Sequence, residues 1–401
     1  MRILVWQWGR RGAGPRFASC LADSLQNRRG ISVSLSLCRN AEIMKSDPPP
    51  CDMPVRTYRG PVSFMLRLLT APIAVPLLLI RLWRIRPDLA ICAMPGPLDL
   101  VMATALRLMR VPMVVMVHEA SSHPGDGFTM QMTLQRLLCR RADALAALSS
   151  HVGSQLVAQG FVGPTRPLIH YTHPPFVFDL PPGTRQPGPP RLLFFGRLLQ
   201  YKGLDLLARA IHLLPPSTEI VVRVVGRGPD SPYLDALRAC RGVTVENHWV
   251  PETEIGALLG WADALILPYR EASQSGVAAA AVAAGRTVIA TRVGGLREQL
   301  SGTPQVVLCE PEPASLARAI GHWLEAPLQT WQTADAADLW RQAASALLSA
   351  IDATLSPRPA ARPPVAVPDG FKAAHTTPLD VMHTNVSVVE PANAYLLHSA
   401  E

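Results

Sequence analysis

Short apolar runs alternate with amphipathic stretches along most of the chain. In the first half, the apolar runs predict strands at residues 3–6, 31–37, 88–94, 111–118 and 144–148. The amphipathic stretches between them predict helices at residues 16–27, 63–84, 98–109, 131–141 and 151–159. Strands that alternate with helices form parallel βαβ units. The pattern therefore predicts one doubly wound sheet in this half.

A segment rich in proline and glycine, residues 181–190, interrupts the alternation, because these residues break both helical and strand periods. After it, apolar runs predict strands at residues 191–195, 219–225, 243–246, 264–267 and 287–291. Helices are expected near residues 203–213, 230–240, 252–261 and 275–284. The second half therefore predicts a second doubly wound domain.

The predicted organisation is an α/β protein with two Rossmann-like domains that face a central cleft. The N-terminal domain covers residues 1–180, a linker covers 181–190, and the C-terminal domain covers 191–330. An amphipathic helix is expected within 331–355, and the proline-rich tail at 356–401 lacks a clear period, so we expect it to be disordered. In such sheets, ligands bind beyond the carboxyl ends of the strands, and a cleft between two domains suits a large substrate pair.

Composition narrows the class of partner. The chain has 401 residues and a formal net charge of +8, which fits an anionic ligand, an anionic membrane surface or nucleic acid. No nucleic-acid module signature is found, so we expect no nucleic-acid partner. The seven cysteines form no CxxC pair, which is typical of a reducing compartment and argues against structural zinc. The first apolar run is too short for a signal peptide, so we expect a cytoplasmic protein.

The segment at residues 64–83 is the one candidate for a membrane span. It contains two arginines and two prolines, so it is marginal for a spanning helix, and we expect a long, partly buried helix. Residues 53–112 hold eight arginines and two aspartates among apolar side chains. This excess fits peripheral contact with an anionic membrane at the inner face. The alternative is a helix packed on the sheet whose arginines extend their charged ends to water.

A glycine turn with two cations follows the predicted strand at 191–195. Its sequence is Gly196-Arg197-Leu198-Leu199-Gln200-Tyr201-Lys202-Gly203. Gly196 frees the backbone at the strand end, and Arg197 and Lys202 can neutralise a diphosphate. Only three of the 38 basic residues are lysines, so a lysine here indicates that a compact, mobile ammonium is wanted. A surface lysine placed by chance is the alternative.

Two further glycine-rich turns follow later strands. Gly226-Arg227-Gly228 comes after the strand at 219–225 and, taken alone, is weak evidence beside an ordinary turn. The polar loop after the strand at 264–267 ends at Ser275 and Gly276, which begin a helix of small residues. The free backbone N–H groups at such a helix start bind anions. A third glycine pair, Gly294-Gly295, follows the strand at 287–291.

The combination of these turns resembles the retaining glycosyltransferases of family 4, which have the two-domain GT-B architecture. The resemblance covers roughly residues 1–350 and is strongest after residue 190. It implies that Arg197 and Lys202 hold the diphosphate of a nucleotide-sugar, with backbone contacts from Ser275 and Gly276. It also implies a nucleotide-sugar loop that is formed by Gly196, Gly226, Arg227 and Gln274.

The chain departs from the family pattern at two carboxylates. The family usually has two glutamates eight positions apart, and the matching places here hold Ala272 and Ala280. Glu271 lies one residue away from the first place and is our candidate for that catalytic role. The second place, which in the family typically holds the nucleotide ribose, has no carboxylate. Gln274 or Ser275 are the candidates to substitute near the sugar.

The N-terminal domain supplies the acceptor side in this resemblance. Gly12 and Gly14 follow the first strand and are similar to the family's glycine-rich acceptor loop. His118 follows an apolar strand and is similar to the His-Asp turn that faces the cleft, so it is predicted to contact the donor sugar as a catalytic residue. The pair His170 and His173 could suggest a metal, but no carboxylate or thiol is near them. The resemblance implies no metal and no cofactor, because the cations neutralise the phosphates.

The leading interpretation is a hexosyltransferase that moves a sugar from a nucleotide-sugar to a glycan or lipid-linked acceptor with retention. Its setting would be polysaccharide or glycolipid biosynthesis. A sugar-nucleotide epimerase on the same two-domain plan is an alternative that requires cleft carboxylates, for which Glu119 and Glu271 are the obvious candidates. A pseudo-glycosyltransferase that binds a partner without turnover is the other alternative, motivated by Ala280.

Overall fold

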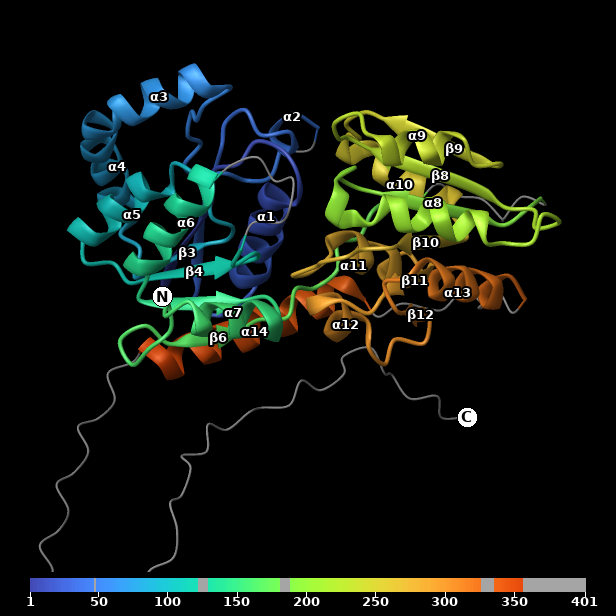
Figure 1. The fold of residues 1–401 in the computed structure, drawn as a ribbon. Helices are drawn as coiled ribbons and strands as arrows, with labels where there is room; N and C mark the ends of the chain where they lie inside the picture. Colours follow the sequence, from blue (N-terminus) through green and yellow to red (C-terminus); the bar gives the residue numbers. More distant parts are fainter. Residues whose placement is uncertain (47, 122–128, 181–187, 326–334, 356–401) are drawn as a thin grey trace, which may run out of the picture.

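The chain folds into two parallel β-sheets, each covered by helices on both faces (Figure 1). The computed structural model describes residues 1–46, 48–121, 129–180, 188–325 and 335–355. The tail at 356–401 and most of the linker at 181–190 lie outside the described residues, as do the first four residues of the segment 331–355. Within the described residues, the two doubly wound domains that the alternation predicts are confirmed.

The N-terminal sheet has six parallel strands in the order β2-β1-β3-β4-β5-β6. The strands are β1 (Arg2–Gln7), β2 (Ser32–Leu37), β3 (Leu89–Cys92), β4 (Met113–Val117), β5 (Ala144–Ala147) and β6 (Leu168–His170). The helices of this domain are α1 (Ala13–Gln26), α2 (Ile43–Ser46), α3 (Pro61–Leu69), α4 (Ala71–Ile85), α5 (Asp99–Leu108), α6 (Thr129–Arg141) and α7 (Ser150–Ala158).

The C-terminal sheet also has six parallel strands, in the order β12-β11-β10-β7-β8-β9. They are β7 (Arg191–Phe195), β8 (Val221–Gly226), β9 (Val243–Asn247), β10 (Ala264–Leu267), β11 (Thr287–Thr291) and β12 (Val306–Cys309). The short 3₁₀ turn η1 (Gln200–Lys202) precedes α8 (Leu204–His212). The remaining helices are α9 (Pro232–Arg238), α10 (Glu252–Trp261), α11 (Gly276–Ala283), α12 (Gly294–Leu300), α13 (Pro313–Glu325) and α14 (Ala336–Leu355).

The central strands are buried on both faces, which explains why they are continuous apolar runs rather than alternating ones. All residues of β3, β4, β5, β10 and β11 are buried. The N-terminal sheet separates two hydrophobic clusters, and the C-terminal sheet has a third around β7, β10 and α8. Polar positions therefore concentrate in the loops at the strand ends.

Helix α14 leaves the C-terminal domain and packs on the N-terminal one, against α1, β5 and β6 (Figure 1). Trp340 is its anchor, because its indole N–H donates to the Pro175 carbonyl at 3.0 Å. The same ring stacks on Phe176 and lies 5.5 Å from Phe17, centroid to centroid. The last helix therefore ties the two ends of the described chain together.

The single long helix that the pattern predicts at 63–84 is wrong. Two helices, α3 and α4, occupy this stretch and meet at Thr70 with a bend of 68°. Pro72 lies in the first turn of α4 and has no backbone N–H, so α3 cannot continue through it. The outward sides of both helices are exposed and Phe64, Leu78 and Leu82 are buried, so the expectation that this segment is partly buried is confirmed.

Several short elements were not predicted from the pattern. The edge strands β6 and β12 have three and four residues, too few for a period to stand out. Helix α13 has a clear apolar face but lies beyond the last predicted strand, as does β12. Helix α12 begins at the glycine pair Gly294-Gly295, which was interpreted only as a loop.

Replacement of the buried anchor of α14 should destabilise the protein. Trp340→Ala removes a ring that is 6% exposed together with its hydrogen bond, so we expect a loss of about 3–5 kcal/mol in the free energy of unfolding. Trp83→Ala is the matched control, because Trp83 is 64% exposed and its loss should cost under about 0.5 kcal/mol. Urea unfolding followed by circular dichroism measures both, and equal losses would contradict the anchoring role.

Candidate active site

The candidate site lies where the C-terminal sheet reverses its winding direction. Strands β7, β8 and β9 are laid out to one side, and the chain then returns to place β10 directly beside β7. Loops that leave neighbouring strands in opposite directions open a crevice at the carboxyl ends of those strands. The loop after β7 carries Arg197 and Lys202, and the loop after β10 leads to Ser275 and Gly276. The topology thus brings the predicted phosphate residues together.

A close backbone contact joins these two loops. Gly203 has φ of +66°, and a Cβ at this position would lie 1.7 Å from the Pro268 carbonyl oxygen. Only glycine allows this approach, which places the end of η1 directly against the loop after β10. The Arg270 backbone N–H also donates to the Tyr201 carbonyl at 2.8 Å. Lys202 is therefore held between two fixed loops.

The turn after β8 packs on the first motif in the same way. A Cβ on Gly226 would lie 1.7 Å from the Gly196 carbonyl oxygen, and φ of Gly226 is +153°. Gly196 itself has φ of +135°, and Leu198 N–H donates to the Arg227 carbonyl at 3.0 Å. Arg227 is exposed at this edge. The Gly226 turn, which taken alone is weak evidence, thus forms one layered turn with the Gly196 motif beside Arg197.

Lys202 lies against two tyrosine rings. Its ammonium nitrogen is 3.6 Å from the ring centroid of Tyr269 and 4.8 Å from that of Tyr201. Both tyrosines are buried, and burial raises the pKa of Tyr269 to about 12. The neutral rings attract a cation through their electron-rich faces. The two rings therefore help to orient the ammonium.

Arg197 reaches both its own loop and the other domain. Its guanidinium donates to the Tyr201 hydroxyl at 2.5 Å and lies 3.6 Å from a carboxylate oxygen of Glu119. Glu119 follows His118 in the N-terminal domain, so this ion pair crosses between the domains. Both side chains are more than a third exposed, so the pair is weak and a more highly charged anion can replace the carboxylate.

The start of α11 supplies N–H groups to the same edge. The Ser275 hydroxyl caps the helix by accepting from Ala278 N–H at 3.2 Å. The Gln299 side chain binds both backbone groups of Ser275, at 2.9 Å each. The backbone N–H of Ser275 is thus occupied, and the two N–H groups that a helix start leaves open are those of Gly276 and Val277. Of the two, Gly276 has the backbone N–H that remains for an anion, and the predicted phosphate contact of both residues stays a prediction.

His118 faces this edge from the N-terminal domain. It follows β4, and its Nε2 lies 3.0 Å from the Ala93 carbonyl oxygen. Desolvation by the surrounding protein lowers the pKa of His118 to about 4, and hydrogen bonds with Ala93 and Gln274 oppose the shift. A carbonyl only accepts, so Nε2 carries the proton of the neutral ring and Nδ1 is an acceptor. His118 is therefore suited to accept a hydroxyl hydrogen bond rather than to carry charge.

Gln274 and Glu271 lie in the loop between β10 and α11. The hydrogen bond between Gln274 and His118 is a second link across the two domains at this edge. Glu271 is exposed, whereas Ala272 beside it is 4% exposed. The Ala272 carbonyl accepts from Gly295 N–H at 2.9 Å, which holds this loop against the start of α12.

The predicted acceptor loop lies at the carboxyl end of β1. Gly12 has φ of +81° and precedes the first residue of α1. Gly14 is buried, and a Cβ there would lie 2.7 Å from the Gln7 side-chain nitrogen and 3.1 Å from the Met94 sulfur. Gly14 thus lets the start of α1 pack closely on the ends of β1 and β3. This is the edge of the N-terminal sheet where that sheet also reverses direction.

The two domains are also joined below the site. The Ser149 hydroxyl donates to the Ser273 carbonyl at 2.9 Å. Glu298 of α12 accepts from the backbone N–H and the hydroxyl of Ser150, each at 2.9 Å, at the N-terminus of α7. A carboxylate at a helix N-terminus is favourable. These contacts fix the loop after β10 relative to the N-terminal domain.

The described residues contain no group of three or more His, Cys, Asp or Glu side chains arranged to hold a metal ion. His173 is buried beside Phe17, Phe176 and Trp340, and burial lowers its pKa to about 3. His173 thus packs in an aromatic cluster, and His170 is exposed. The predicted absence of a metal or cofactor stays a prediction.

Two models of known protein families match this chain, one in each domain. The model described as glycosyl transferase 4-like domain matches residues 12–171, and the one described as glycosyl transferases group 1 matches residues 189–326. The two ranges cover both domains. The chain belongs to glycosyltransferase family 4, with the GT-B fold.

Curated relatives of this family 4 chain match part of its length. Glycogen synthase of Mycobacterium tuberculosis (strain ATCC 25618 / H37Rv) is 31% identical over 247 residues, or 57% of this chain and 58% of that protein. The 2-deoxystreptamine glucosyltransferase of Streptomyces kanamyceticus is 31% identical over 150 residues, or 36% and 39%. The matches therefore span less than two thirds of these relatives.

Solved structures share the fold at lower identity. Anabaena HepE, solved in complex with UDP and glucose, is 17% identical with a TM-score of 0.62, covering 88% of this chain and 95% of that one. Sucrose-phosphate synthase from Thermosynechococcus elongatus is 16% identical with a TM-score of 0.60, covering 86% and 94%. UDP-GlcNAc 2-epimerase from Neisseria meningitidis is 10% identical with a TM-score of 0.53, covering 87% and 99%. These likenesses concern the fold alone.

Sequence analysis of this family 4 chain missed the residues that orient its cations. Tyr201 lies inside the first motif and Tyr269 follows Pro268, but no spacing rule connects them. Glu119 was considered only as an epimerase carboxylate and not as a partner of Arg197. Gln299 lies 24 residues beyond Ser275 and gave no signal. The one signal in the sequence was a tyrosine in each of the two loops, Tyr201 after β7 and Tyr269 after β10.

Substitution of Gly203 should disrupt the site and the fold together. Gly203→Ala places a Cβ against the Pro268 carbonyl at positive φ, so we expect a loss of about 3 kcal/mol in the free energy of unfolding. Gly321→Ala on α13 is the control, because nothing lies within 4 Å of its Cβ and the helix should gain up to about 1 kcal/mol. Urea unfolding measures both, and an unchanged Gly203→Ala midpoint would refute the close contact.

The low pKa of His118 predicts a pH-dependent stability. Below pH 6.5 the unfolded histidine gains a proton that the folded ring does not take until about pH 4, so stability falls across this window as pH decreases. His118→Gln cannot take the proton, so it should lack about 2 kcal/mol of this dependence. Asp99, whose pKa burial raises to about 7, is present in both proteins, so their difference reports residue 118 together with its charge coupling to His173. The free energy of unfolding of both proteins is measured from pH 7 to 4.5, and an equal change in the two proteins would contradict this assignment.

Proposed function

We propose that this chain transfers a sugar from a nucleotide-sugar donor to a glycan or lipid-linked acceptor. One observation supports the proposal most directly. Arg197, Lys202 and the open N–H groups of Gly276 and Val277 converge on one switch point and face His118 of the other domain. Two cations and a helix start make a site for a diphosphate, and the opposite domain offers a polar acceptor for a sugar hydroxyl.

The proposed chemistry breaks the bond between the sugar C1 atom and the diphosphate oxygen. The diphosphate leaves with the electron pair, and Lys202, Arg197 and the α11 amides stabilise its growing negative charge. The acceptor hydroxyl attacks C1 from the face that the diphosphate leaves, so the configuration is retained, and its proton passes to the leaving phosphate oxygen. Glu119 gives up Arg197 when the diphosphate binds, because the diphosphate carries more charge at the guanidinium.

His118 and Gln274 are assigned to the sugar in this proposal. The neutral His118 ring has Nδ1 as its one acceptor, and Gln274 hydrogen-bonds with that ring, so a sugar hydroxyl would replace or share the Gln274 contact. Glu271 lies in the loop beside them and is the carboxylate assigned to the reacting sugar. The Gly12 and Gly14 loop on the opposite domain is assigned to the acceptor. The pathway that follows from a glycan or lipid-linked acceptor is polysaccharide or glycolipid biosynthesis.

Loss of the Lys202 ammonium should weaken donor binding. Lys202→Ala removes a charge-assisted contact with the diphosphate, so we expect a 10- to 100-fold higher Kd, or about 1.5–3 kcal/mol. Isothermal titration with a panel of UDP- and GDP-sugars measures it. Lys45→Ala is the control, because Lys45 is an exposed lysine on α2 and should leave Kd unchanged. Equal affinity of the Lys202→Ala and wild-type proteins would count against the proposal.

Ala272 and Ala280 favour a second candidate, a pseudo-glycosyltransferase that binds donor without turnover. Both side chains are buried methyl groups at the two places where the family usually has carboxylates. Incubation of the full chain with labelled donors and a membrane extract separates the outcomes by product. Sugar transfer supports the transferase, release of a 2-epimer supports the epimerase alternative, and tight donor binding with neither product supports the pseudo-enzyme.

A further inference from the structure

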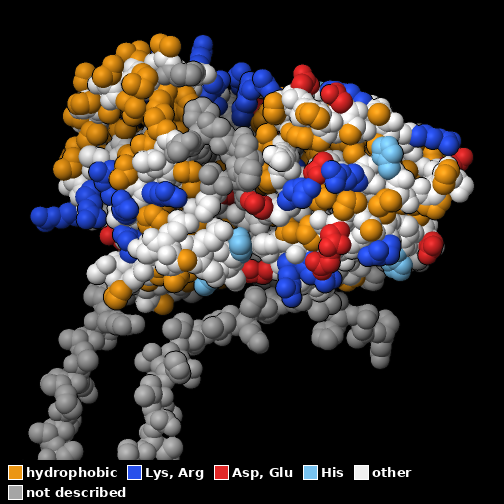
Figure 2. All heavy atoms as spheres, viewed as in Figure 1, with side chains coloured by type: hydrophobic (Ala, Val, Ile, Leu, Met, Phe, Trp, Pro, Cys, Tyr) orange, Lys and Arg blue, Asp and Glu red, His pale blue; other side chains and the backbone are white. Residues whose placement is uncertain are grey.

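Helices α3 and α4 present an unusually apolar surface to solvent. Eight large hydrophobic side chains there are 54% to 85% exposed, and we call them the α3–α4 apolar face: Val62, Met65, Leu66, Leu69, Ile73, Leu77, Ile80 and Trp83. Figure 2 shows hydrophobic side chains gathered over this part of the N-terminal domain. Contiguous exposed apolar patches on soluble proteins mark interaction sites.

This face is not needed for the core of its own domain. The opposite sides of the two helices already pack inward through Phe64, Leu78 and Leu82, which are each at most 6% exposed. Ile73, Leu77 and Ile80 follow at spacings of four and three, so they form one outward stripe along α4. The two helices are therefore apolar on both sides, and the outer side lacks a partner within the described part of the chain.

The charged residues of the segment that carries the face are all positive. Residues 53–87 contain six arginines and no aspartate or glutamate. Arg67 is on α3, Arg84 is in the last turn of α4, and the Arg86 guanidinium lies 5.1 Å from the Trp83 ring centroid. Tryptophan and arginine are the side chains that favour the boundary between lipid headgroups and acyl chains.

The geometry favours a position on a membrane surface rather than across it. Among the described residues, no helix alone is both long and apolar enough for a span, and the α3–α4 pair meets that test only jointly and by length and composition. The 9 residues of α3 and 15 of α4 are about 13 Å and 22 Å long, short of a hydrocarbon core of about 30 Å. The 68° bend between them spreads the apolar face sideways.

We infer that the α3–α4 apolar face binds an anionic lipid surface. Its apolar side chains enter the boundary between headgroups and acyl chains, and the arginines contact the lipid phosphates. A second copy of the chain fits this face less well, because a symmetric contact would place arginine against arginine without any carboxylate. Basic residues near an anionic surface are attracted to it, so the arginines decide the lipid class.

The face is linked to the loop that is assigned to the acceptor. The Arg10 guanidinium donates to the Arg59 carbonyl at 3.4 Å, directly before α3, and the Arg10 carbonyl accepts from Glu42 N–H at 2.9 Å. Arg10 lies two residues before Gly12. Binding at α3 and α4 thus holds the Gly12 loop near the headgroup layer, where a lipid-linked acceptor would be found. This last step rests on the proposed function, whereas lipid binding itself does not.

Co-sedimentation of the full chain with vesicles tests the lipid surface directly. One vesicle set is pure phosphatidylcholine, and the other is an equal mixture of phosphatidylcholine and phosphatidylglycerol. We expect binding to the mixed vesicles that is at least tenfold stronger and that weakens as salt is added. Equal binding to both sets, or no binding to either, would overturn the inference. Sugar transfer is not measured, so the result is independent of the proposed function.

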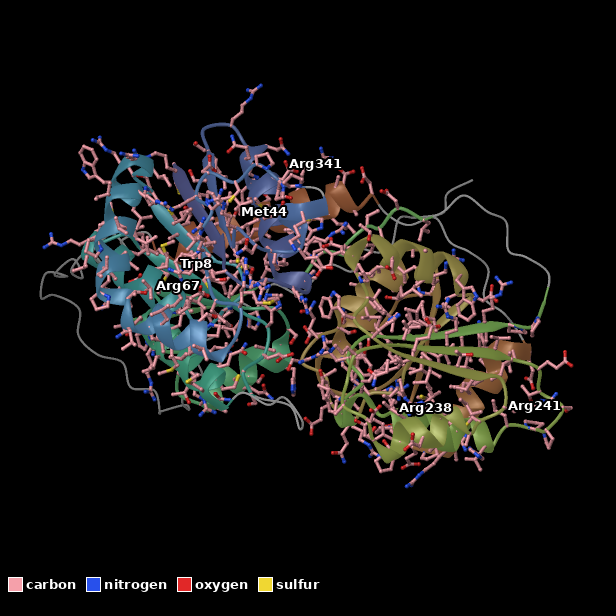
Figure 3. All side chains as sticks on the ribbon, turned by 90° about the horizontal axis from the view of Figure 1, so that it is seen from above. Trp8, Met44, Arg67, Arg238, Arg241 and Arg341 are labelled. Atoms are coloured by element: carbon pink, nitrogen blue, oxygen red, sulfur yellow. The ribbon has the colours of Figure 1, made fainter. Side chains whose placement is uncertain are left out.

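Paired variants locate the contact. Leu69→Ser with Ile73→Ser should reduce binding to the mixed vesicles at least tenfold, and Val157→Ser with Leu213→Ser, also exposed but outside the face, should not. Arg67→Gln with Arg84→Gln should also reduce binding to the mixed vesicles more than tenfold, because two basic residues that contact an anionic surface are lost. The matched control, Arg238→Gln with Arg241→Gln, should leave that binding unchanged. Figure 3 shows Arg67 in the N-terminal domain and Arg238 and Arg241 in the other.

Two measurements keep these variants interpretable. Circular dichroism and the thermal midpoint confirm that each variant folds, which is expected because the changed side chains are exposed. Light scattering of the wild type in solution should give a monomer. A dimer that becomes a monomer in the Leu69→Ser and Ile73→Ser variant would overturn the lipid surface in favour of a second copy on the same face.

Discussion

The contact of Gly203 with the Pro268 carbonyl is the constraint on which the site depends. It exists because one residue without a side chain takes positive φ at the point where two loops leave neighbouring strands. This contact places Lys202 against the ring of Tyr269, which belongs to the second loop. The Arg270 hydrogen bond to Tyr201 strengthens the same junction. A larger residue at 203 would separate Lys202 from the start of α11, which is proposed to bind the same diphosphate.

The site also depends on contacts that bring the two domains together. Arg197 and Gln274 of one domain reach Glu119 and His118 of the other, so the residues proposed for the phosphate and for the sugar are linked directly. The Glu298 contacts at α7 hold the base of this arrangement. The Arg197–Glu119 pair is exposed and weak, whereas the hydrogen bond from Ser149 to Ser273 is buried, so a ligand can replace the first without disturbing the second.

Sequence reasoning recovered the features that a single segment encodes. The motif from Gly196 to Gly203 combines a strand, a turn and two cations in eight residues, and the strand alternation brings it to one edge of a sheet. It could not recover partners contributed by other segments, such as Tyr269 for Lys202 or Gln299 for Ser275. The α3–α4 segment shows the converse limit. Its residues are apolar on both sides of each helix, so the pattern cannot tell which side faces solvent.

The alanines at 272 and 280 change which groups in such a site can bind its ligand. A carboxylate selects by accepting defined hydroxyl donors, whereas Lys202, Arg197 and the α11 amides recognise charge and are tolerant of what the phosphate carries. Under the proposed function, buried methyl groups at both carboxylate positions shift the binding energy toward the diphosphate. Discrimination among sugars then falls to polar groups of the facing domain and the β10 loop, with His118 and Gln274 closest to that task. In this proposal affinity comes from the C-terminal domain, whereas selectivity is shared between the two domains, through His118 on one side and Gln274 on the other.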